Sequence, residues 1–246
     1  MRQLENKIAL ITGASQGIGK TIAKKFSREG ACVVITARNK NGLESVAGEI
    51  NDSGHKTFII EADLSHLQDI RRIVSETIKE CGRIDILVNN AGIIHPSIDL
   101  IDLDPNLWNE VININLTAPA LLSKEVLPFM IENRSGNIIN ISSIGGRMGG
   151  KGRTAYRASK AGLINLTQSI AAEVKQYGID VNCICPSATD TEGFRKNIDQ
   201  RGRDHNPKIM LPEEIAEIAL FLASDASSAI TGTSIDAFGG TNPIFN

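Results

Sequence analysis

The chain has few of the residues that bind metals or cross-link small proteins. Its four cysteines include no CxxC pair, and its four histidines are scattered without the spacing of metal ligands. This pattern argues against a zinc site and against a disulfide framework. We therefore expect no bound metal, and we expect the cysteines to be free thiols in a reducing compartment: Cys32, Cys81, Cys183 and Cys185.

Long hydrophobic runs and a strong net charge are also missing. The first apolar run begins only at Ile8, and no run approaches the ~18 residues that a membrane span needs. The formal net charge is −2, which predicts no general affinity for nucleic acid. We expect a soluble, cytoplasmic protein that binds neither membranes nor nucleic acid.

The composition is that of an ordinary globular protein. Hydrophobic residues make up 41% of the chain and charged residues 22%, so a packed core rather than disorder is expected. A chain of 246 residues is within the range of one large α/β domain, and neither a repeat nor a low-complexity linker divides it. The sequence predicts a single domain over residues 1–246, with a substrate lid around residues 192–211.

Short apolar runs alternate with longer helical patterns along the chain. A series of strands separated by helices predicts a parallel sheet covered on both faces. Right-handed crossovers then give a doubly wound α/β fold. The six predicted strands are Ile8–Ile11, Cys32–Thr36, Thr57–Ile60, Ile84–Val88, Asn137–Ile141 and Asp180–Ile184.

A glycine-rich turn follows the first predicted strand. It runs from Thr12 to Gly19 and opens a helix that extends to about Glu29. Glycines let the backbone pass close to a pyrophosphate, while the helix N-terminus offers unpaired N–H groups and a partial positive charge. The spacing is GxxxGxG rather than the commoner GxGxxG, and any strand-to-helix turn can use glycine. Its position after the first strand favours a nucleotide site.

The end of the second predicted strand carries an arginine where an NAD-binding chain often has a carboxylate. No Asp or Glu occurs between Ala31 and Leu43, whereas Arg38 could pair with a 2′-phosphate. The alternative is a solvated arginine at a strand end. We predict that NADP(H) is preferred over NAD(H).

Tyr156 and Lys160 are four residues apart in a predicted helix, so both side chains lie on one face. Tyrosine titrates near ~10, and its use as an acid or base at neutral pH requires stabilising the anion by roughly 4 kcal/mol. A lysine charge about 4 Å away supplies roughly that much at an effective dielectric constant of about 20. Taken alone, the pair is more typical of a half-buried ring beside a solvated charge.

Several motifs occur in a fixed order along the chain. They are TGxxxGxG at Thr12–Gly19, Asp63 after the third strand, NNAG at Asn89–Gly92 after the fourth, Asn115, Ser143, and YxxxK at Tyr156–Lys160. In this order they resemble the short-chain dehydrogenase/reductase family over essentially the full length of the chain. The resemblance implies a Rossmann-type oxidoreductase.

The resemblance also implies roles for individual residues. Tyr156 is the expected general acid, Ser143 the group that hydrogen-bonds a substrate carbonyl, and Lys160 the residue that holds the nicotinamide ribose and lowers the tyrosine pKa. Asn115 would help to hold a water in a proton relay, and Ser142 is expected to be structural. The expected cofactor-binding residues are Gly13, Ser15, Gln16, Gly17, Ile18, Gly19, Arg38, Asp63, Leu64, Asn90, Ala91, Gly92, Ile114, Tyr156, Lys160, Pro186 and Thr191.

The chain departs from the family pattern in two places. Ser187 stands where glycine commonly follows Pro186, so the backbone there could be less free to approach the cofactor amide. The segment Ile235–Gly240 differs from the usual pattern at a strand end, and the sequence assigns no role to Phe238.

A proline marks a break in the helix predicted from Pro105 to about Ile131. Pro119 cannot donate the backbone hydrogen bond that the Asn115 carbonyl would normally accept. We expect a kink that leaves this carbonyl free to bind water near the active site. The alternative is a kink packed away from function.

The expected substrate loops, Gly145–Arg153 and Glu192–Leu211, carry an excess of positive charge. They suggest an anionic substrate or an acidic carrier, although solvated loop charge is an equally good interpretation. The predicted reaction is NADPH-dependent carbonyl reduction, with a 3-oxoacyl thioester as one candidate substrate. The alternatives are a dehydrogenase of a sugar or other secondary alcohol, and a non-catalytic NADP-binding redox sensor. The resemblance implies a homotetramer.

Overall fold

Seven parallel strands form the central sheet in a computed structural model of the chain, which describes residues 2–197 and 209–239. Their order is β3-β2-β1-β4-β5-β6-β7, so the expected doubly wound fold is confirmed. The strands are β1 (Ile8–Thr12), β2 (Cys32–Ala37), β3 (Thr57–Glu61), β4 (Ile86–Asn89), β5 (Gly136–Ile141), β6 (Ile179–Pro186) and β7 (Ser234–Ala237).

The strands are buried on both faces, as apolar runs predict for a parallel sheet. In β1, Ala9, Leu10 and Ile11 are fully buried. Successive side chains point to opposite faces, so Ala9 and Ile11 belong to one hydrophobic cluster and Leu10 to another. The sheet therefore separates two cores, one under each layer of helices.

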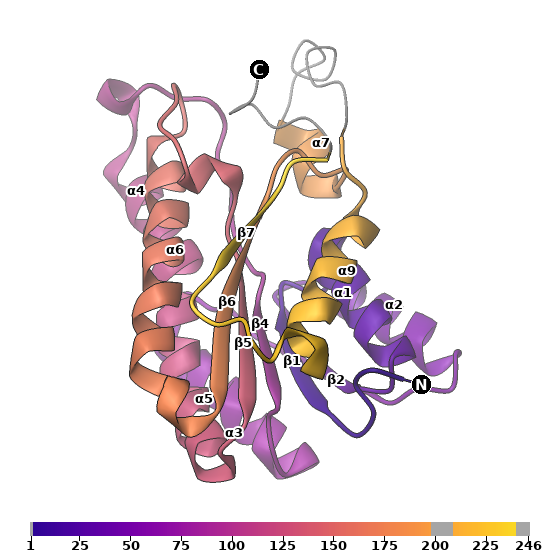
Figure 1. The fold of residues 1–246 in the computed structure, drawn as a ribbon. Helices are drawn as coiled ribbons and strands as arrows, with labels where there is room; N and C mark the ends of the chain where they lie inside the picture. The colour runs from indigo at the N-terminus through magenta and orange to yellow at the C-terminus, as the bar shows by residue number, and fades with distance from the viewer. Residues whose placement is uncertain (1, 198–208, 240–246) are drawn as a thin grey trace.

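Helices cover both faces of the sheet (Figure 1). One layer contains α1 (Gly17–Arg28), α2 (Lys40–Asn51) and α9 (Pro212–Ala223), and the other contains α3 (Leu67–Cys81), α4 (Pro105–Ile112), α5 (Ala118–Asn133) and α6 (Thr154–Val174). Shorter helical segments are η1 (Leu100–Asp102), η3 (Ile144–Gly146), η4 (Lys175–Tyr177), α7 (Glu192–Asn197) and η5 (Asp225–Ser227). None of the described helices is long and apolar enough to cross a membrane.

The helix predicted over Pro105–Ile131 is not a continuous α-helix. A π-helical segment, η2 (Asn113–Thr117), separates α4 from α5, and the Ala118 N–H bonds the Asn113 carbonyl five residues back. Pro119 explains why the α-helical pattern stops here, because it has no N–H to offer the Asn115 carbonyl. The break expected at Pro119 therefore takes the form of a wider, π-helical turn, a feature often found at functional sites.

The strand β7 is not among the six strands that the sequence predicts. It has only four residues, and the polar Ser234 and Asp236 interrupt its apolar pattern. It pairs with β6, where Asp236 is opposite Cys185. Of the predicted lid, 192–197 and 209–211 are described, whereas 198–208 lies outside the described residues.

Candidate active site

The carboxyl ends of the strands surround a cavity of about 460 Å³. It lies where the strand order reverses between β1 and β4, the position at which open α/β sheets bind ligands. Segments that follow β1 to β6 all contribute to its wall. One wide site thus collects residues that are far apart in the sequence.

The glycine-rich turn forms a close-packed cradle at one side of this cavity. Gly13 has a φ of 64°, and a Cβ there would lie 2.8 Å from the Ala91 Cα. At Gly19 a Cβ would lie 2.5 Å from the Gly13 carbonyl oxygen. No side chain fits at either position, because the turn packs directly against the loop after β4. The N-terminus of α1 at Gly17 and Ile18 lines the cavity, where its N–H groups can bind a diphosphate. The residues present therefore fit a dinucleotide cofactor.

Asn90 holds this turn against the end of β4. Its side-chain amide donates to the Thr12 carbonyl at 2.9 Å and to the Gly13 carbonyl at 3.2 Å. The Thr12 hydroxyl accepts hydrogen bonds from the backbone N–H groups of Asn90 and Ala91, both at 3.0 Å. These bonds fix the cradle before any ligand binds.

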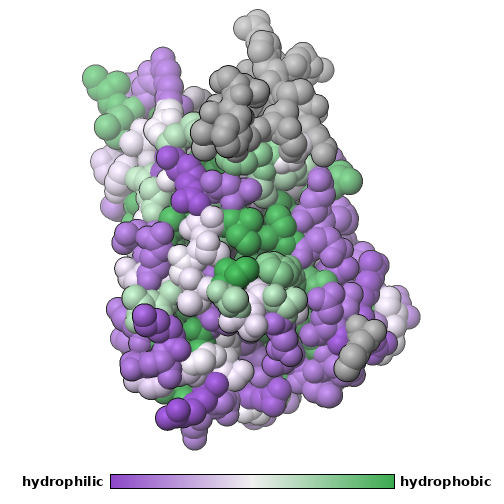
Figure 2. Space-filling view, in the orientation of Figure 1, coloured by the Kyte–Doolittle hydropathy of each residue, from purple (hydrophilic) through white to green (hydrophobic). Residues whose placement is uncertain are grey.

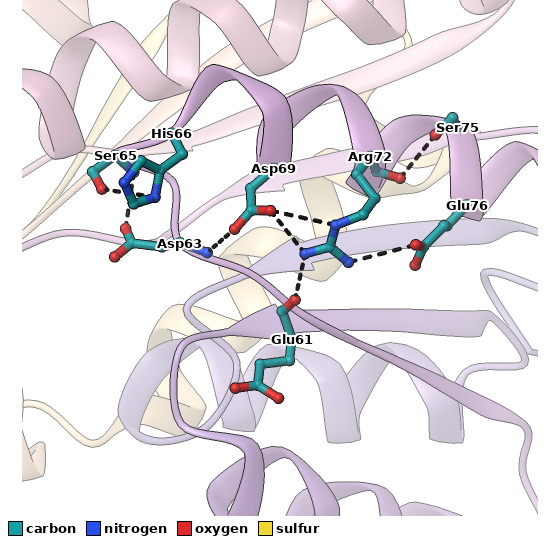
Figure 3. A network of polar contacts seen from close by, with 8 residues as sticks. All are labelled: Glu61, Asp63, Ser65, His66, Asp69, Arg72, Ser75 and Glu76. Atoms are coloured by element: carbon teal, nitrogen blue, oxygen red, sulfur yellow. Dashed lines mark hydrogen bonds and ion pairs between the residues drawn. The ribbon is translucent and has the colours of Figure 1, made fainter.

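Asp63 is held in place by a network around the start of α3 (Figure 3). Its backbone N–H donates to the Asp69 carboxylate at 2.8 Å, and Asp69 in turn pairs with Arg72 at 2.9 Å. Arg72 also donates to the Glu61 carbonyl at 2.8 Å, which ties α3 to the end of β3. Asp69 and Arg72 were not identified from the sequence, because only the fold brings them to this loop.

The Asp63 carboxylate itself faces several groups that stabilise its charge. Burial acts to raise its pKa, but hydrogen bonds from Ser65 and the charge of Arg38 outweigh burial and lower the pKa. The Arg38 guanidinium lies 3.9 Å from this carboxylate and is 62% exposed. Arg38 is therefore loosely held at the edge of the cavity and can turn toward a ligand phosphate.

The Ser143 hydroxyl and the Tyr156 ring lie next to each other in the cavity wall. Ser143 caps the turn η3, and its hydroxyl accepts a hydrogen bond from the Gly145 N–H at 3.0 Å. A Cβ at Gly145 would lie 3.3 Å from the Ser143 oxygen and 3.6 Å from the Tyr156 ring. Two hydroxyl groups, one at the start of η3 and one on α6, thus line the same cavity and are available to one reacting oxygen.

The pKa of Tyr156 differs from the sequence prediction. Burial raises it above the ordinary value of tyrosine, and this effect exceeds the lowering by the Ser143 hydroxyl and by the charges of Arg153 and Arg157. The Lys160 ammonium lies 5.8 Å from the centre of the tyrosine ring. Burial thus outweighs the groups that lower the phenol pKa in the protein alone, and the lowering by Lys160 stays a prediction.

Lys160 is almost completely buried beside the tyrosine, with an exposed fraction of 4%. Its ammonium donates to the Ile141 carbonyl at 2.8 Å, at the end of β5. Burial lowers the pKa of Lys160 to about 8, because few groups replace the water lost from the ammonium. A cation that is shielded from water attracts nearby anions more strongly than an exposed one does.

The side chain of Asn115 connects the loop after β4 to α6. Its amide donates to the Ile93 carbonyl at 2.9 Å and to the Ser159 hydroxyl at 3.1 Å, and its oxygen accepts from the Ile93 N–H at 2.8 Å. Ser159 donates onward to the Tyr156 carbonyl at 2.7 Å. The side chain is thus structural, and the proton relay through the Asn115 carbonyl stays a prediction.

Most of the residues expected from the sequence meet in this one cavity. Those that line it are Gly13, Ser15, Gln16, Gly17, Ile18, Arg38, Asp63, Leu64, Asn90, Ala91, Gly92, Ile114, Ser143, Tyr156, Lys160, Pro186 and Thr191. Gly19 and Asn115 are buried next to it. Ser142 also lines the cavity, and its hydroxyl donates to the Lys160 carbonyl at 2.8 Å.

The cavity wall also contains residues that the sequence did not single out. They are Thr36, Ala37, Asn39, Ala62, Ile93, Ile94, Ile141, Thr189, Gly193 and Phe194. Several of them end a strand or directly follow one, and that position was the available signal. Ser187 lines the cavity with an ordinary negative-φ backbone, so serine is accommodated there without strain.

Comparison with known proteins decides the family. The sequence pattern of the family described as short chain dehydrogenase matches residues 7–202. The chain belongs to the short-chain dehydrogenase family. As a member, it is an NAD(P)-dependent oxidoreductase that acts on C=O and CH–OH groups.

Relatives within the short-chain dehydrogenase family cover almost the whole chain. A 3-oxoacyl-acyl-carrier-protein reductase of Vibrio harveyi is 39% identical over 96% of this chain and 98% of its own length. The enzyme of that name from Thermotoga maritima is 37% identical over 97% of this chain and 98% of its own length. A solved structure described as an NAD(P)-dependent gluconate 5-dehydrogenase from Beutenbergia cavernae, with NADP bound at low occupancy, superposes with a TM-score of 0.90 at 33% identity, covering 97% of each chain.

Proposed function

We propose that the protein reduces a carbonyl group to a secondary alcohol with NADPH, and that Tyr156 donates the proton. The observation that carries this proposal is the placement of two hydroxyl groups, on Ser143 and Tyr156, in the same cavity as the diphosphate cradle at Gly13–Gly19. A nicotinamide cofactor held in that cradle would supply the hydride. The chain's own groups then have to orient the carbonyl and manage one proton.

Each of these groups has a defined task. Reduction builds negative charge on the carbonyl oxygen, and hydrogen bonds from Ser143 and Tyr156 stabilise that charge as it forms. The raised pKa of Tyr156 keeps the phenol protonated at neutral pH, which suits a proton donor. The buried ammonium of Lys160 holds the cofactor ribose and stabilises the phenolate that is left behind. Asn115 completes the relay by holding a water at its carbonyl.

Arg38 sets the cofactor preference in this proposal. It is mostly exposed and has only a 3.9 Å ion pair with Asp63, so its guanidinium can form a bidentate pair with a 2′-phosphate. Arg38→Ser is expected to lower kcat/KM for NADPH by about 10- to 100-fold, the equivalent of about 1.5–3 kcal/mol for charged hydrogen bonds. The kcat/KM for NADH is expected to change less than about twofold. Initial rates with both cofactors measure this.

Arg71→Ser is the matched control for Arg38→Ser. Arg71 is 61% exposed and has a similarly loose ion pair, 3.6 Å from Glu125, so its removal changes the net charge equally. It lies on α3, and its loss should leave both cofactors unaffected. An equal loss with NADPH and NADH in Arg38→Ser, or a wild type that prefers NADH, would contradict the assignment.

A 3-oxoacyl thioester is the proposed substrate class, and a sugar or other secondary alcohol is the alternative. The Vibrio and Thermotoga relatives support the thioester, whereas the Beutenbergia neighbour supports a sugar acid. The experiment compares reduction of acetoacetyl-coenzyme A with oxidation of a panel of sugars, sugar acids and cyclic alcohols. Efficient turnover of the thioester with NADPH is expected; turnover confined to the sugar panel would favour the alternative. A non-catalytic sensor is disfavoured, because it needs no proton donor.

We also propose that the enzyme is a cytoplasmic homotetramer. Leu107, Leu121 and Leu166 on α4, α5 and α6 are only half-buried. By contrast, four other apolar residues of these helices belong to the protomer's own core: Val111, Leu122, Ile164 and Ile170. Hydrophobic surface also lies in the middle of the face that carries β7 and α9 (Figure 2). Such surfaces can bury against other subunits, and light scattering after size-exclusion chromatography measures the mass.

A further inference from the structure

The loop that follows Ser143 is fastened to the edge strand of the sheet by an arginine. Arg147 ends the turn η3, and its guanidinium donates to the Asp236 carboxylate at 2.7 Å and to the Ser234 carbonyl at 2.9 Å. Both partners belong to β7, almost ninety residues later in the chain. Arg147 is thus joined to β7 by one ion pair and one hydrogen bond to a backbone carbonyl.

This contact lies next to the catalytic residues. A Cβ at Gly146 would lie 2.7 Å from the Lys160 carbonyl carbon, so the turn rests directly on the backbone of α6. At the other end of the turn, the Ser143 hydroxyl accepts from the Gly145 N–H. The turn has no room to move toward α6, and Arg147 and its partners limit its movement away from α6 on the side of β7.

The Arg147 charge is occupied by this contact rather than directed at a substrate. Arg147 and Asp236 are 31% and 27% exposed, so water screens the pair only in part. Asp236 is held in register opposite Cys185 in β6, and Pro186, the last residue of β6, lines the cavity. Arg147 is not among the described residues that line the cavity. The positive charge that the sequence suggested as a substrate contact is therefore neutralised within the protein.

We infer that Asp236 is a positioning residue: through Arg147 it fixes the turn η3, and with it the Ser143 hydroxyl, in the geometry needed to bind the reacting carbonyl. The inference rests on the proposed role of Ser143. It also gives a function to Asp236, one residue of the segment that departs from the family pattern. A misplacement of about 1 Å in such a group is enough to reduce turnover strongly.

The test uses the full-length enzyme and four variants: Asp236→Asn, Arg147→Met, the two combined, and Asp236→Glu. Asp236→Asn and Arg147→Met are each expected to lower kcat about tenfold, with the NADPH dissociation constant unchanged within about twofold, because the cradle at Gly13–Gly19 is remote from β7. The double variant should be no worse than either single one. Asp236→Glu, which keeps the charge, should recover part of the lost kcat.

Hydrogen exchange gives a readout that does not depend on the substrate. The N–H groups of Gly145, Gly146 and Arg147 are all bonded within the turn. Their exchange is expected to accelerate in Asp236→Asn while peptides from β1 and α1 are unchanged. If the proposed substrate class is wrong, this local change still appears, so failure of the positioning role and failure of the proposed function are distinguishable.

Asp99→Asn is the matched control. Asp99 forms an ion pair at 3.3 Å with Lys151, which lies on the same loop as Arg147. The Asp99 and Lys151 side chains are 50% and 84% exposed. The loss of this ion pair should change neither kcat nor exchange in the turn. If Asp236→Asn is too unstable to purify, the exchanged pair Arg147→Asp with Asp236→Arg restores the contact and should recover kcat and protection.

Three results would overturn the inference. One is a kcat of Asp236→Asn within about twofold of wild type, with unchanged exchange in the turn. Another is additive losses in the double variant, which would mean that the two residues act separately. The third is a change of KM for an anionic thioester in opposite directions: lower in Asp236→Asn and higher in Arg147→Met. Arg147 would then be a substrate contact that Asp236 restrains.

Discussion

Tyr156→Phe is expected to lower kcat by about 10²- to 10⁴-fold, the contribution that a positioned proton donor usually makes. The substitution removes only the hydroxyl, and the ring keeps its contacts with the turn at Gly145. Binding of NADPH should therefore change little, and the loss should appear in kcat. Single-turnover reduction of the best carbonyl substrate, combined with a fluorescence titration of NADPH, measures both quantities.

The chain offers a matched control, because Tyr177 is its only other tyrosine. Tyr177 is in η4, beyond the C-terminal end of α6, and is only partly buried. Tyr177→Phe should keep wild-type turnover. If Tyr156→Phe left turnover unchanged on every substrate that the wild type accepts, the assignment of the proton donor would be wrong.

Lys160→Met is expected to abolish most activity without destabilising the fold. The loss of the ammonium should lower kcat/KM by at least about 100-fold, because it removes both the ribose contact and the stabilisation of the phenolate. The pKa of Lys160 falls from 10.5 to about 8, so keeping its charge buried costs about 3 kcal/mol at pH 7. The hydrogen bond to the Ile141 carbonyl returns about 1.5–3 kcal/mol.

These two effects nearly cancel, so urea unfolding at pH 7 should give the same free energy for Lys160→Met and wild type within about 1 kcal/mol. Between pH 8 and 10.5 the unfolded chain keeps the lysine proton while the folded chain loses it. The unfolding free energy of the wild type should therefore rise relative to that of Lys160→Met over this range. Lys175→Met, at an exposed lysine of η4, should show neither effect. A large loss of stability at pH 7 would assign Lys160 a structural role instead.

Features that depend on neighbouring residues were predictable from the sequence. The predicted strands lie within two residues of those found, because apolar runs between turns are a local signal. The turn Thr12–Gly19 and the positions of Asp63 and Asn90 followed from the same reasoning, since each lies at the carboxyl end of a strand. Ser143 was assigned from the family resemblance and its spacing from Tyr156. Once the strands are parallel, their carboxyl ends must share one edge.

The nature of the break before α5 was only partly predictable. Pro119 signals that the Asn115 carbonyl loses its usual partner, but it does not say how the helix responds. The protein widens the helix into the π-helical segment Asn113–Thr117, a choice made by packing against neighbouring elements. The side chain of Asn115 then bonds Ile93 and Ser159, which no spacing along the chain predicts.

The sequence by itself determined the fold class, the family and many of the residues that meet at the cavity, because these follow from periodicity, from turns and from motifs in a fixed order. Only the tertiary structure decided the electrostatics of Tyr156 and Lys160, since burial and not helical spacing sets the direction of both pKa shifts. The tertiary structure also decided the partner of Arg147, a residue that the sequence identified only as a positive charge in a loop. That partner, Asp236, is supplied by a short strand whose place beside β6 depends on the assembled sheet.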